Sequence, residues 1–99
     1  MKTGVELIAK ERQKQIEKHG RTIESDSQNN NGEQLAQAAS CLSYPFHYAQ
    51  NNDDIPDGWD RDTFLKLWKK PHIKKLVIAG ALIAAEIDRL QYEGVKHED

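Results

Sequence analysis

Apolar residues recur along this chain at intervals of three and four, which is the spacing of one face of an α-helix. The first such stretch has four apolar residues on one face: Val5, Ile8, Ala9 and Ile16. Thr3 and Glu6 have the spacing of a capping box, in which each side chain bonds the other residue's backbone N–H at a helix start. Gly20 is a natural C-terminal stop. The pattern predicts a helix over about 4–19.

A polar segment follows and predicts a loop over 21–31, because asparagine and serine compete with helix by bonding their own backbone. A second helix is predicted at about 32–43, with Asn30 or Asn31 as its N-cap and Pro45 closing it. Its apolar residues also keep helical spacing: Leu35, Ala38, Ala39 and Leu42.

Residues 44–60 contain two prolines, one glycine and several amides and acids, which is typical of a connecting loop. A connection of this length is uncommon in a compact domain unless it binds something or packs through its aromatic side chains. A short helix at about 61–69 is expected to follow. It carries three large apolar residues: Phe64, Leu65 and Trp68.

The last predicted helix has the strongest pattern, with Pro71 in its first turn and Gly94 at its end. One stripe of helical spacing contains Ile73, Leu76, Val77, Gly80, Ile83, Ala84, Ile87 and Leu90. A second stripe lies on another face and contains Ile78, Leu82 and Ala85. A helix that is apolar on two faces must be covered on both. Because two short partner helices do not suffice, we predict a dimer or a higher oligomer.

The composition places the whole chain, 1–99, in one all-α domain of three main helices plus one short helix. Only 37% of the residues are hydrophobic and 30% are charged, so the core is expected to be small and the stability margin thin. Sharing apolar faces between subunits would add stability.

The formal net charge of −2 provides no overall attraction to nucleic acid or to acidic membranes, so neither partner is expected. The most apolar stretch, 76–85, is about half the length that spans a bilayer, and the N-terminus lacks the apolar run of a signal peptide. The single cysteine, Cys41, rules out an intrachain disulfide and fits a reducing compartment. We expect a cytoplasmic protein, with Cys41 in or near the core.

Arg12 falls within the apolar stripe of the first helix. A guanidinium on a buried face requires a charged partner, because an unpaired buried charge is costly. Three interpretations remain open. Arg12 forms a structural ion pair with Glu33 or Glu86, it extends to the surface, or its planar fork of donors faces a ligand phosphate or carboxylate.

A cluster of basic residues surrounds Trp68: Lys66, Lys69, Lys70, His72, Lys74 and Lys75. Cations at a helix start oppose the helix dipole, so a bound phosphate would make this arrangement attractive. Trp68 or Trp59 could then stack on a base. The alternative is a solvated run of charges with Trp68 in the core. The predicted ligand-binding residues are Arg12, Trp68, Lys69, Lys70 and Lys74.

Carboxylates decide between an enzyme and a binding protein. A magnesium site for nucleotide hydrolysis needs several carboxylates that converge, commonly from helical i, i+3 or i+4 spacing. No predicted helix has such a cluster, although Glu11, Glu33 and Glu86 could converge from three helices. Histidine spacing typical of metal ligands and a phosphate-binding glycine loop are both missing. We therefore predict no catalytic residue, metal or cofactor.

Three segments, GVELIAKERQKQIEKHG, GEQLAQAA and KKLVIAGALIAAEIDRL, resemble a widespread group of short phage and prophage proteins. The resemblance covers most of the chain. Its most specific parts are the run of Glu11, Arg12 and Gln15 and the Ala-Gly-Ala-Leu-Ile-x-Ala-Glu-Ile block. Some of that group look similar to the MazG-type all-α nucleotide pyrophosphohydrolases.

The MazG-type motif is a Glu-Glu-x-x-Glu helix followed by a Glu-x-x-Asp helix, and together these bind magnesium. This chain departs from it, because no glutamate follows Glu33 and because Glu86 and Asp88 are two residues apart. Phages also carry small oligomeric proteins that sequester the nucleotide signals of bacterial defence and need only basic and aromatic groups in a pocket. The lead hypothesis is such a non-catalytic binder of a phosphorylated small ligand. The alternatives are a degenerate magnesium-dependent MazG-like hydrolase and a module that binds a host protein.

Overall fold

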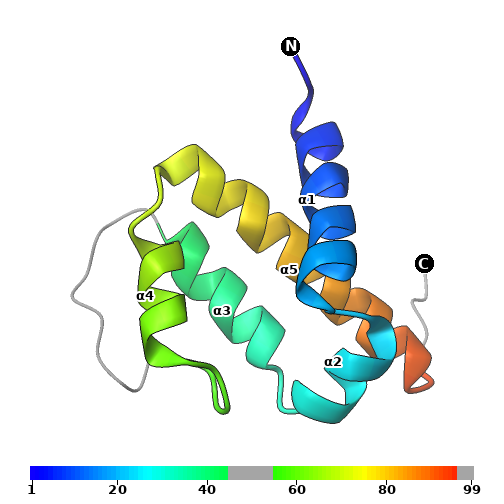
Figure 1. Ribbon diagram of the computed structural model, residues 1–99. Helices are drawn as coiled ribbons and strands as arrows, with labels where there is room; N and C mark the ends of the chain where they lie inside the picture. Colours follow the sequence, from blue (N-terminus) through cyan, green and yellow to red (C-terminus); the bar gives the residue numbers. More distant parts are fainter. Residues whose placement is uncertain (45–54, 96–99) are drawn as a thin grey trace.

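The protein is all-α, and the computed structural model describes residues 1–44 and 55–95 of it (Figure 1). These residues form five helices: α1 (Gly4–His19), α2 (Ile23–Asn29), α3 (Gln34–Ser43), α4 (Arg61–Trp68) and α5 (His72–Tyr92). The predicted fold class is thereby confirmed. No helix in this part of the chain is both long enough and apolar enough to cross a membrane.

The ends of α1 agree with the sequence signals. The Thr3 N–H donates to Glu6 Oε1 at 3.0 Å, and the Glu6 N–H donates to Thr3 Oγ1 at 3.2 Å, so the capping box is formed. Gly20 follows the helix with a φ of 65°, in the left-handed region that glycine enters without steric cost. These local bonds satisfy N–H groups that a helix start otherwise leaves without partners.

The predicted loop over 21–31 is wrong, because this segment contains α2. Thr22 Oγ1 caps the helix by accepting from the Ser25 N–H at 3.1 Å. Asp26 and Asn30 are buried, and the Asn30 side chain donates to Asp26 at 2.9 Å. Thr22 thus bonds the backbone only as a cap, and Asp26 and Asn30 bond each other instead of the backbone, which removes the competition that disfavours a helix.

The helix predicted at 32–43 exists as α3 and begins at Gln34. Neither Asn30 nor Asn31 caps it. Glu33 precedes it with a φ of 69°, and no side chain bonds the first turn. Asn30 instead ends α2, where its N–H donates to the Asp26 carbonyl. Pro45 lies outside the described residues.

The short predicted helix is α4, and Asp60 caps it by accepting from the Thr63 N–H at 2.9 Å. The predicted connection over 44–60 is described only at Tyr44 and over 55–60.

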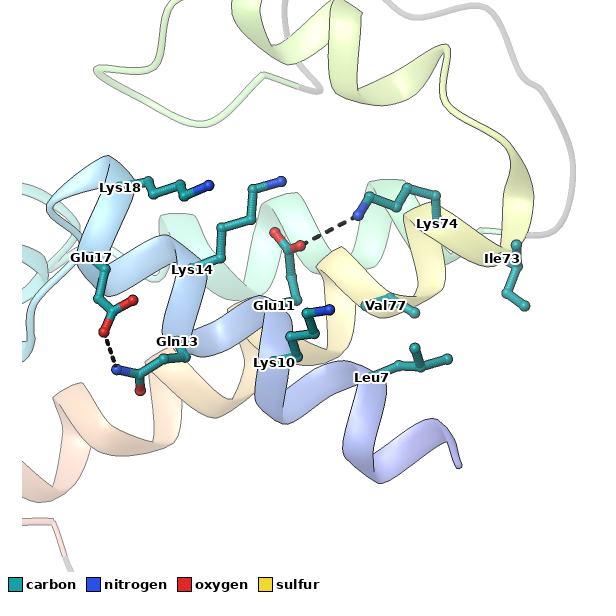
Figure 2. Close-up of a pocket in the computed structure, with 10 residues that line it drawn as sticks. All are labelled: Leu7, Lys10, Glu11, Gln13, Lys14, Glu17, Lys18, Ile73, Lys74 and Val77. Atoms are coloured by element: carbon teal, nitrogen blue, oxygen red, sulfur yellow. Dashed lines mark hydrogen bonds and ion pairs between the residues drawn. The ribbon is translucent and has the colours of Figure 1, made fainter. Parts of the chain in front are cut away.

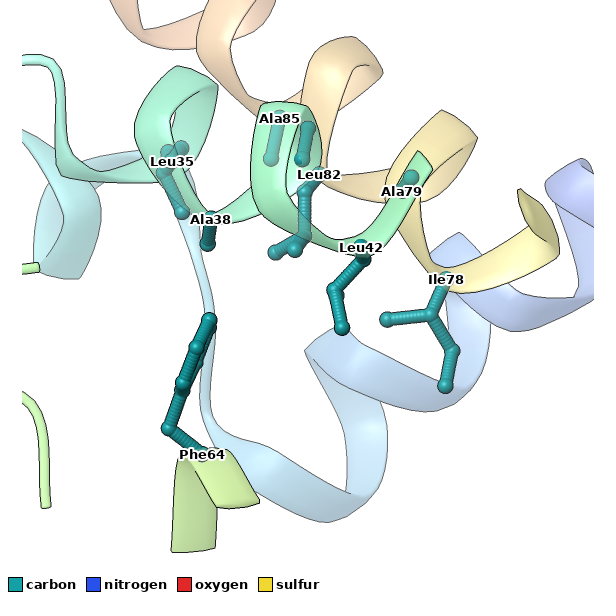
Figure 3. Close-up of a cluster of buried hydrophobic side chains, with 9 residues drawn as sticks. Leu35, Ala38, Leu42, Phe64, Ile78, Ala79, Leu82 and Ala85 are labelled. Atoms are coloured by element: carbon teal, nitrogen blue, oxygen red, sulfur yellow. The ribbon is translucent and has the colours of Figure 1, made fainter. Parts of the chain in front are cut away.

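The core lies between α3 and α5, which run side by side, and Phe64 of α4 closes it (Figure 3). Alanines on both helices let the two backbones approach closely, which keeps the core thin. Its buried residues are Leu35, Ala38, Ala39, Leu42, Phe64, Ile78, Ala79, Leu82 and Ala85. Trp68 and Cys41 are partly buried against this cluster, so Cys41 lies beside the core as expected.

The two apolar stripes of α5 have different environments. The shorter one, Ile78, Leu82 and Ala85, packs into the core. The longer one is only partly covered, by α1 crossing over Gly80. Four large side chains of this longer stripe remain between 42% and 68% exposed: Ile73, Leu76, Ile83 and Ile87.

The inner face of α1 is polar. Its buried residues are Glu11, Arg12 and Gln15, whereas Val5 and Ala9 of the predicted apolar stripe are exposed. Of that stripe, only Arg12 is buried. The helix therefore brings ionisable and amide groups to the surface of α5, and these groups form the site described below.

We expect Gly80→Val to destabilise the fold by about 1–3 kcal/mol, as overpacked core substitutions do. A Cβ at position 80 would lie 2.5 Å from Ile8 Cδ1 and 2.8 Å from its Cγ1. Urea unfolding measures the change. In an Ile8→Ala background the same substitution should cost less, because the clashing atoms are gone. An equal cost in both backgrounds would contradict the crossing of α1 over Gly80.

Candidate ligand-binding cleft

A cleft lies between α1 and α4, and Ile78 and Leu82 of α5 form its floor. Its narrower part has a volume of about 160 Å³ and joins a hollow of about 310 Å³ beside α2. Both parts are lined by His19, Arg21, Trp59, Thr63 and Leu67, so we treat them as one cavity, the inner cleft. Its wider part alone reaches the size of small-molecule sites, about 300–1,000 Å³.

A second hollow of about 620 Å³ lies between α1 and the first turns of α5 (Figure 2). We call it the lysine groove, because four lysines line it: Lys10, Lys14, Lys18 and Lys74. Only Lys74 is ion-paired within the described residues, with its Nζ 3.5 Å from Glu11 Oε1. Glu11 lines both cavities, so the lysine groove and the inner cleft lie on either side of this residue or beside it.

One wall of the inner cleft is a stack of ring and guanidinium. The Arg21 guanidinium carbon lies 4.5 Å from the centre of the Trp59 ring. Trp59 Nε1 donates to Asn30 Oδ1 at 2.7 Å, and Asn30 Nδ2 donates to Asp26 Oδ1 at 2.9 Å. Burial lowers the pKa of Arg21, and the attraction of Asp26 partly opposes this shift. The chain of bonds holds the indole in place between α2 and α4.

The opposite wall is the polar face of α1. Gln15 Nε2 donates to Glu11 Oε2 at 3.3 Å, which fixes the orientation of both side chains. Arg12 Nη1 donates to the Arg21 carbonyl at 3.0 Å, and its Nη2 lies 3.4 Å from Asp88 Oδ2. The buried Arg12 thus has a charged partner, as expected, and it holds the start of α2 against α1.

The partner of Arg12 corrects the sequence analysis, which named Glu33 or Glu86 as candidates. Glu33 is exposed beside the first turn of α3. Glu86 is bonded by its own helix neighbour, since Arg89 Nε donates to Glu86 Oε1 at 2.6 Å. This bond, with a second one from Arg89 to Glu93, raises the pKa of the buried arginine above its usual value.

The same geometry bears on a magnesium site built from Glu11, Glu33 and Glu86. Within residues 1–44 and 55–95, no three acidic, histidine or cysteine side chains are grouped closely enough to hold a metal ion. Two of the three carboxylates already have cationic partners, Lys74 for Glu11 and Arg89 for Glu86. The convergence that the hydrolase alternative requires does not occur.

Several buried polar atoms have no hydrogen-bond partner among the described residues. Gln15 Oε1 and Asp26 Oδ2 belong to side chains that line the inner cleft, and Arg12 Nε belongs to a neighbouring residue of α1 that does not line it. Such groups cost roughly 1–3 kcal/mol each when they lack a partner. The fourth is Lys75 Nζ, which lies 4.3 Å from the centre of the Trp68 ring on the far side of the core. The walls of the inner cleft therefore retain unused hydrogen-bonding capacity.

The five residues predicted as a binding site do not form one cluster. Arg12 pairs with Asp88, whereas Lys74 pairs with Glu11 and lines the lysine groove, whose lining does not include Arg12. Lys69 and Lys70 are exposed between α4 and α5. Trp68 packs against the core, which is the alternative that the sequence left open.

Sequence reasoning missed most of the lining of both cavities. The spacing of Lys10, Lys14 and Lys18, one helical turn apart, was a signal that could have revealed the lysine groove. Asp26 and Asn30 carried no such signal, because their segment has the composition of a loop. Comparisons with protein families, curated proteins and solved structures found no match, so the functional argument depends on the geometry of these cavities.

We expect Asp26→Asn to raise the melting temperature by a few degrees at pH 7. Burial raises the pKa of Asp26, with Glu86 adding to the shift and Asn30, Arg21 and Arg12 opposing it. The carboxyl of Asp26 thus binds its proton more tightly in the folded protein than in the unfolded chain, where the pKa of an aspartate is about 3.9. Stability then falls as pH rises between these two pKa values, and the loss persists at neutral pH.

Thermal unfolding followed by circular dichroism at pH 4 and pH 7 tests this expectation. The gain of Asp26→Asn should be larger at pH 7 than at pH 4. Asp57→Asn is the control, because Asp57 is exposed. A variant that melts below the wild type at pH 7 would show that the charged Asp26 is stabilising on balance.

Proposed function

We propose that this protein binds a phosphorylated small molecule of the nucleotide class and retains it without altering it. The observation that carries the proposal is that the two cavities share Glu11 as a lining residue: the inner cleft offers an aromatic stack and polar walls, and the neighbouring lysine groove offers cations. A nucleotide has the same two halves, a planar base and charged phosphates.

The lysine groove suits the phosphates. Lys10, Lys14 and Lys18 follow one another at i, i+4 spacing on α1, and like charges at this spacing repel. These three lysines form no ion pair with any described residue, so a polyanion would relieve their repulsion. Figure 2 shows Lys74 extending from α5 toward the side chains of α1 across the groove.

The inner cleft suits the base. Trp59 presents a ring that is already stacked with Arg21 at 4.5 Å, and the floor of Ile78 and Leu82 is apolar. Stacking of a base on an aromatic side chain contributes about 1–3 kcal/mol. The arrangement favours a ligand that lies across Glu11, with its ring inside and its phosphates toward the lysines.

Retention without hydrolysis is supported by the positions and partners of the carboxylates Glu11, Glu33 and Glu86. Glu86 is bonded by Arg89, and Glu33 is exposed at the start of α3, so neither is gathered with Glu11. In a phage protein, which the sequence resembles, such binding would sequester a nucleotide signal of bacterial defence in the host cytoplasm. Basic and aromatic groups in a pocket are sufficient for that role.

We also propose that a second copy of the chain covers the exposed apolar stripe of α5. Ile73, Leu76, Ile83 and Ile87 lie on one face, and Val5 of α1 is exposed as well. Burying these five side chains in each subunit would remove roughly 1,000 Å² of apolar surface from water, the lower bound for a stable interface. A two-fold dimer needs only this self-complementary patch. A host protein on the same face is the alternative.

Binding is tested by isothermal titration with nucleoside mono-, di- and triphosphates in the presence of magnesium. We expect micromolar dissociation constants that weaken with added salt. The double variant Lys14→Gln/Lys18→Gln should weaken binding by about tenfold or more, which is about 1.4 kcal/mol. The matched control is Lys69→Gln/Lys70→Gln, which makes the same charge change outside both cavities.

Native mass spectrometry of the same samples reports the mass of the retained ligand. An unaltered nucleotide supports retention, whereas release of pyrophosphate would decide for the hydrolase. A wild-type protein that binds no nucleotide would overturn the proposed function. If the Lys69 and Lys70 variant loses binding and the Lys14 and Lys18 variant keeps it, the site predicted from sequence is the correct one.

The dimer is tested by size-exclusion chromatography with light scattering. We expect the wild type to be dimeric and Ile83→Lys/Ile87→Lys to be monomeric, because two buried charges oppose association. Helical content should be unchanged, since both side chains are exposed in the single chain. Ala36→Lys, on the exposed side of α3, is the control. A wild type that stays monomeric at high micromolar concentration would contradict the proposal.

A further inference from the structure

Two acceptor oxygens on side chains that line the inner cleft accept no hydrogen bond from any described residue. They are Gln15 Oε1 and Asp26 Oδ2, on side chains that are only 4% and 1% exposed. The other polar atom of each side chain is occupied: Gln15 Nε2 donates to Glu11, and Asp26 Oδ1 accepts from Asn30. These bonds hold the two side chains in place and leave both oxygens as acceptors.

The neighbouring cations do not bond these oxygens. Arg12 donates from its two terminal nitrogens to the Arg21 carbonyl and to Asp88. The Arg21 guanidinium makes its described contact through its face, with the ring of Trp59. Two arginines thus neutralise the surroundings of Asp26 without filling its second oxygen. A buried acceptor without a hydrogen costs about 1–3 kcal/mol, so a donor supplied by a ligand would be strongly favoured.

We propose that the inner cleft selects a nucleobase that carries an exocyclic amino group, which donates to one of these two acceptors, Gln15 Oε1 or Asp26 Oδ2. This inference rests on the proposed function and adds the class of base. Adenine, cytosine and guanine have such a group. Uracil, thymine, hypoxanthine and xanthine have a carbonyl or a hydrogen in its place, and a carbonyl oxygen would face another acceptor.

The charges also set the direction in which the ligand lies. Phosphate oxygens are attracted by the lysines of the lysine groove, three of which form no ion pair with a described residue, whereas Arg12 and Arg21 are already balanced by Asp88 and Asp26. The base therefore enters first and its amino group reaches the acceptors. Because both oxygens are covered, one neighbouring side chain must move aside. Arg21 lines both parts of the cleft and is held by its stack on Trp59 and by the attraction of Asp26, with no described hydrogen bond of its guanidinium, so we expect it to be the side chain that moves and then stacks on the base.

The experiment compares nucleotides that differ only in the amino group. Guanosine monophosphate is paired with inosine monophosphate, and adenosine monophosphate with purine riboside monophosphate. Each pair has the same sugar, ring system and phosphate, so the lysine groove contributes equally to both. We expect the amino form to bind roughly 5- to 100-fold more tightly in at least one pair.

Two variants test the assignment to residues. Gln15→Met removes one acceptor at similar volume, and Asp26→Asn replaces the free oxygen with an amide nitrogen or leaves it uncharged. At least one of the two should reduce the preference within the pair, while Asp57→Asn should keep it. Circular dichroism verifies that each variant is folded. One substitution lies in α1 and the other in α2, so misfolding of one variant would leave the other as a test.

The outcomes separate the two claims. If no nucleotide binds, the proposed function fails and this inference fails with it. If both members of each pair bind equally, or the form without the amino group binds more tightly, the inference is overturned and the proposed function stands. A preference that survives in both Gln15→Met and Asp26→Asn would overturn the role of these two acceptors.

Discussion

The rest of the structure depends on the close approach of α1 to α5 at Gly80. The missing side chain there lets Ile8 lie against the helix backbone, and no Cβ could occupy that space without moving it. With this crossing in place, the polar face of α1 turns inward and brings Glu11, Arg12 and Gln15 beside α2 and α5. The same crossing is too narrow to cover the long apolar stripe of α5.

Packing a helix through a polar face costs free energy, because ionisable groups lose their hydration. Here the losses are only partly offset. Arg89 is bonded on both sides by Glu86 and Glu93, but Asp26 and Gln15 each keep an unsatisfied oxygen. A small core between α3 and α5 has to support this cluster. Binding of the proposed ligand and the proposed association through α5 would each add stability.

The helices could be located from sequence because their signals are local. The Thr3–Glu6 capping box and the glycine at 20 act within a few residues, so the ends of α1 were predicted correctly. The site could not be located in the same way. Its walls come from α1, α2, α4 with the segment before it, and α5. The contribution of α2 was not recognised, because its segment is rich in asparagine.

The sequence by itself determined the all-α class, the helix positions other than α2, and the presence of two apolar stripes on the last helix. Only the tertiary structure decided which stripe became the core, because both have the same period and periodicity carries no information about the partner surface. It likewise decided that Arg12 pairs with Asp88 and that Asp26 is buried. Helix caps depend on neighbours in the chain, whereas ion pairs and cavities depend on how the helices cross.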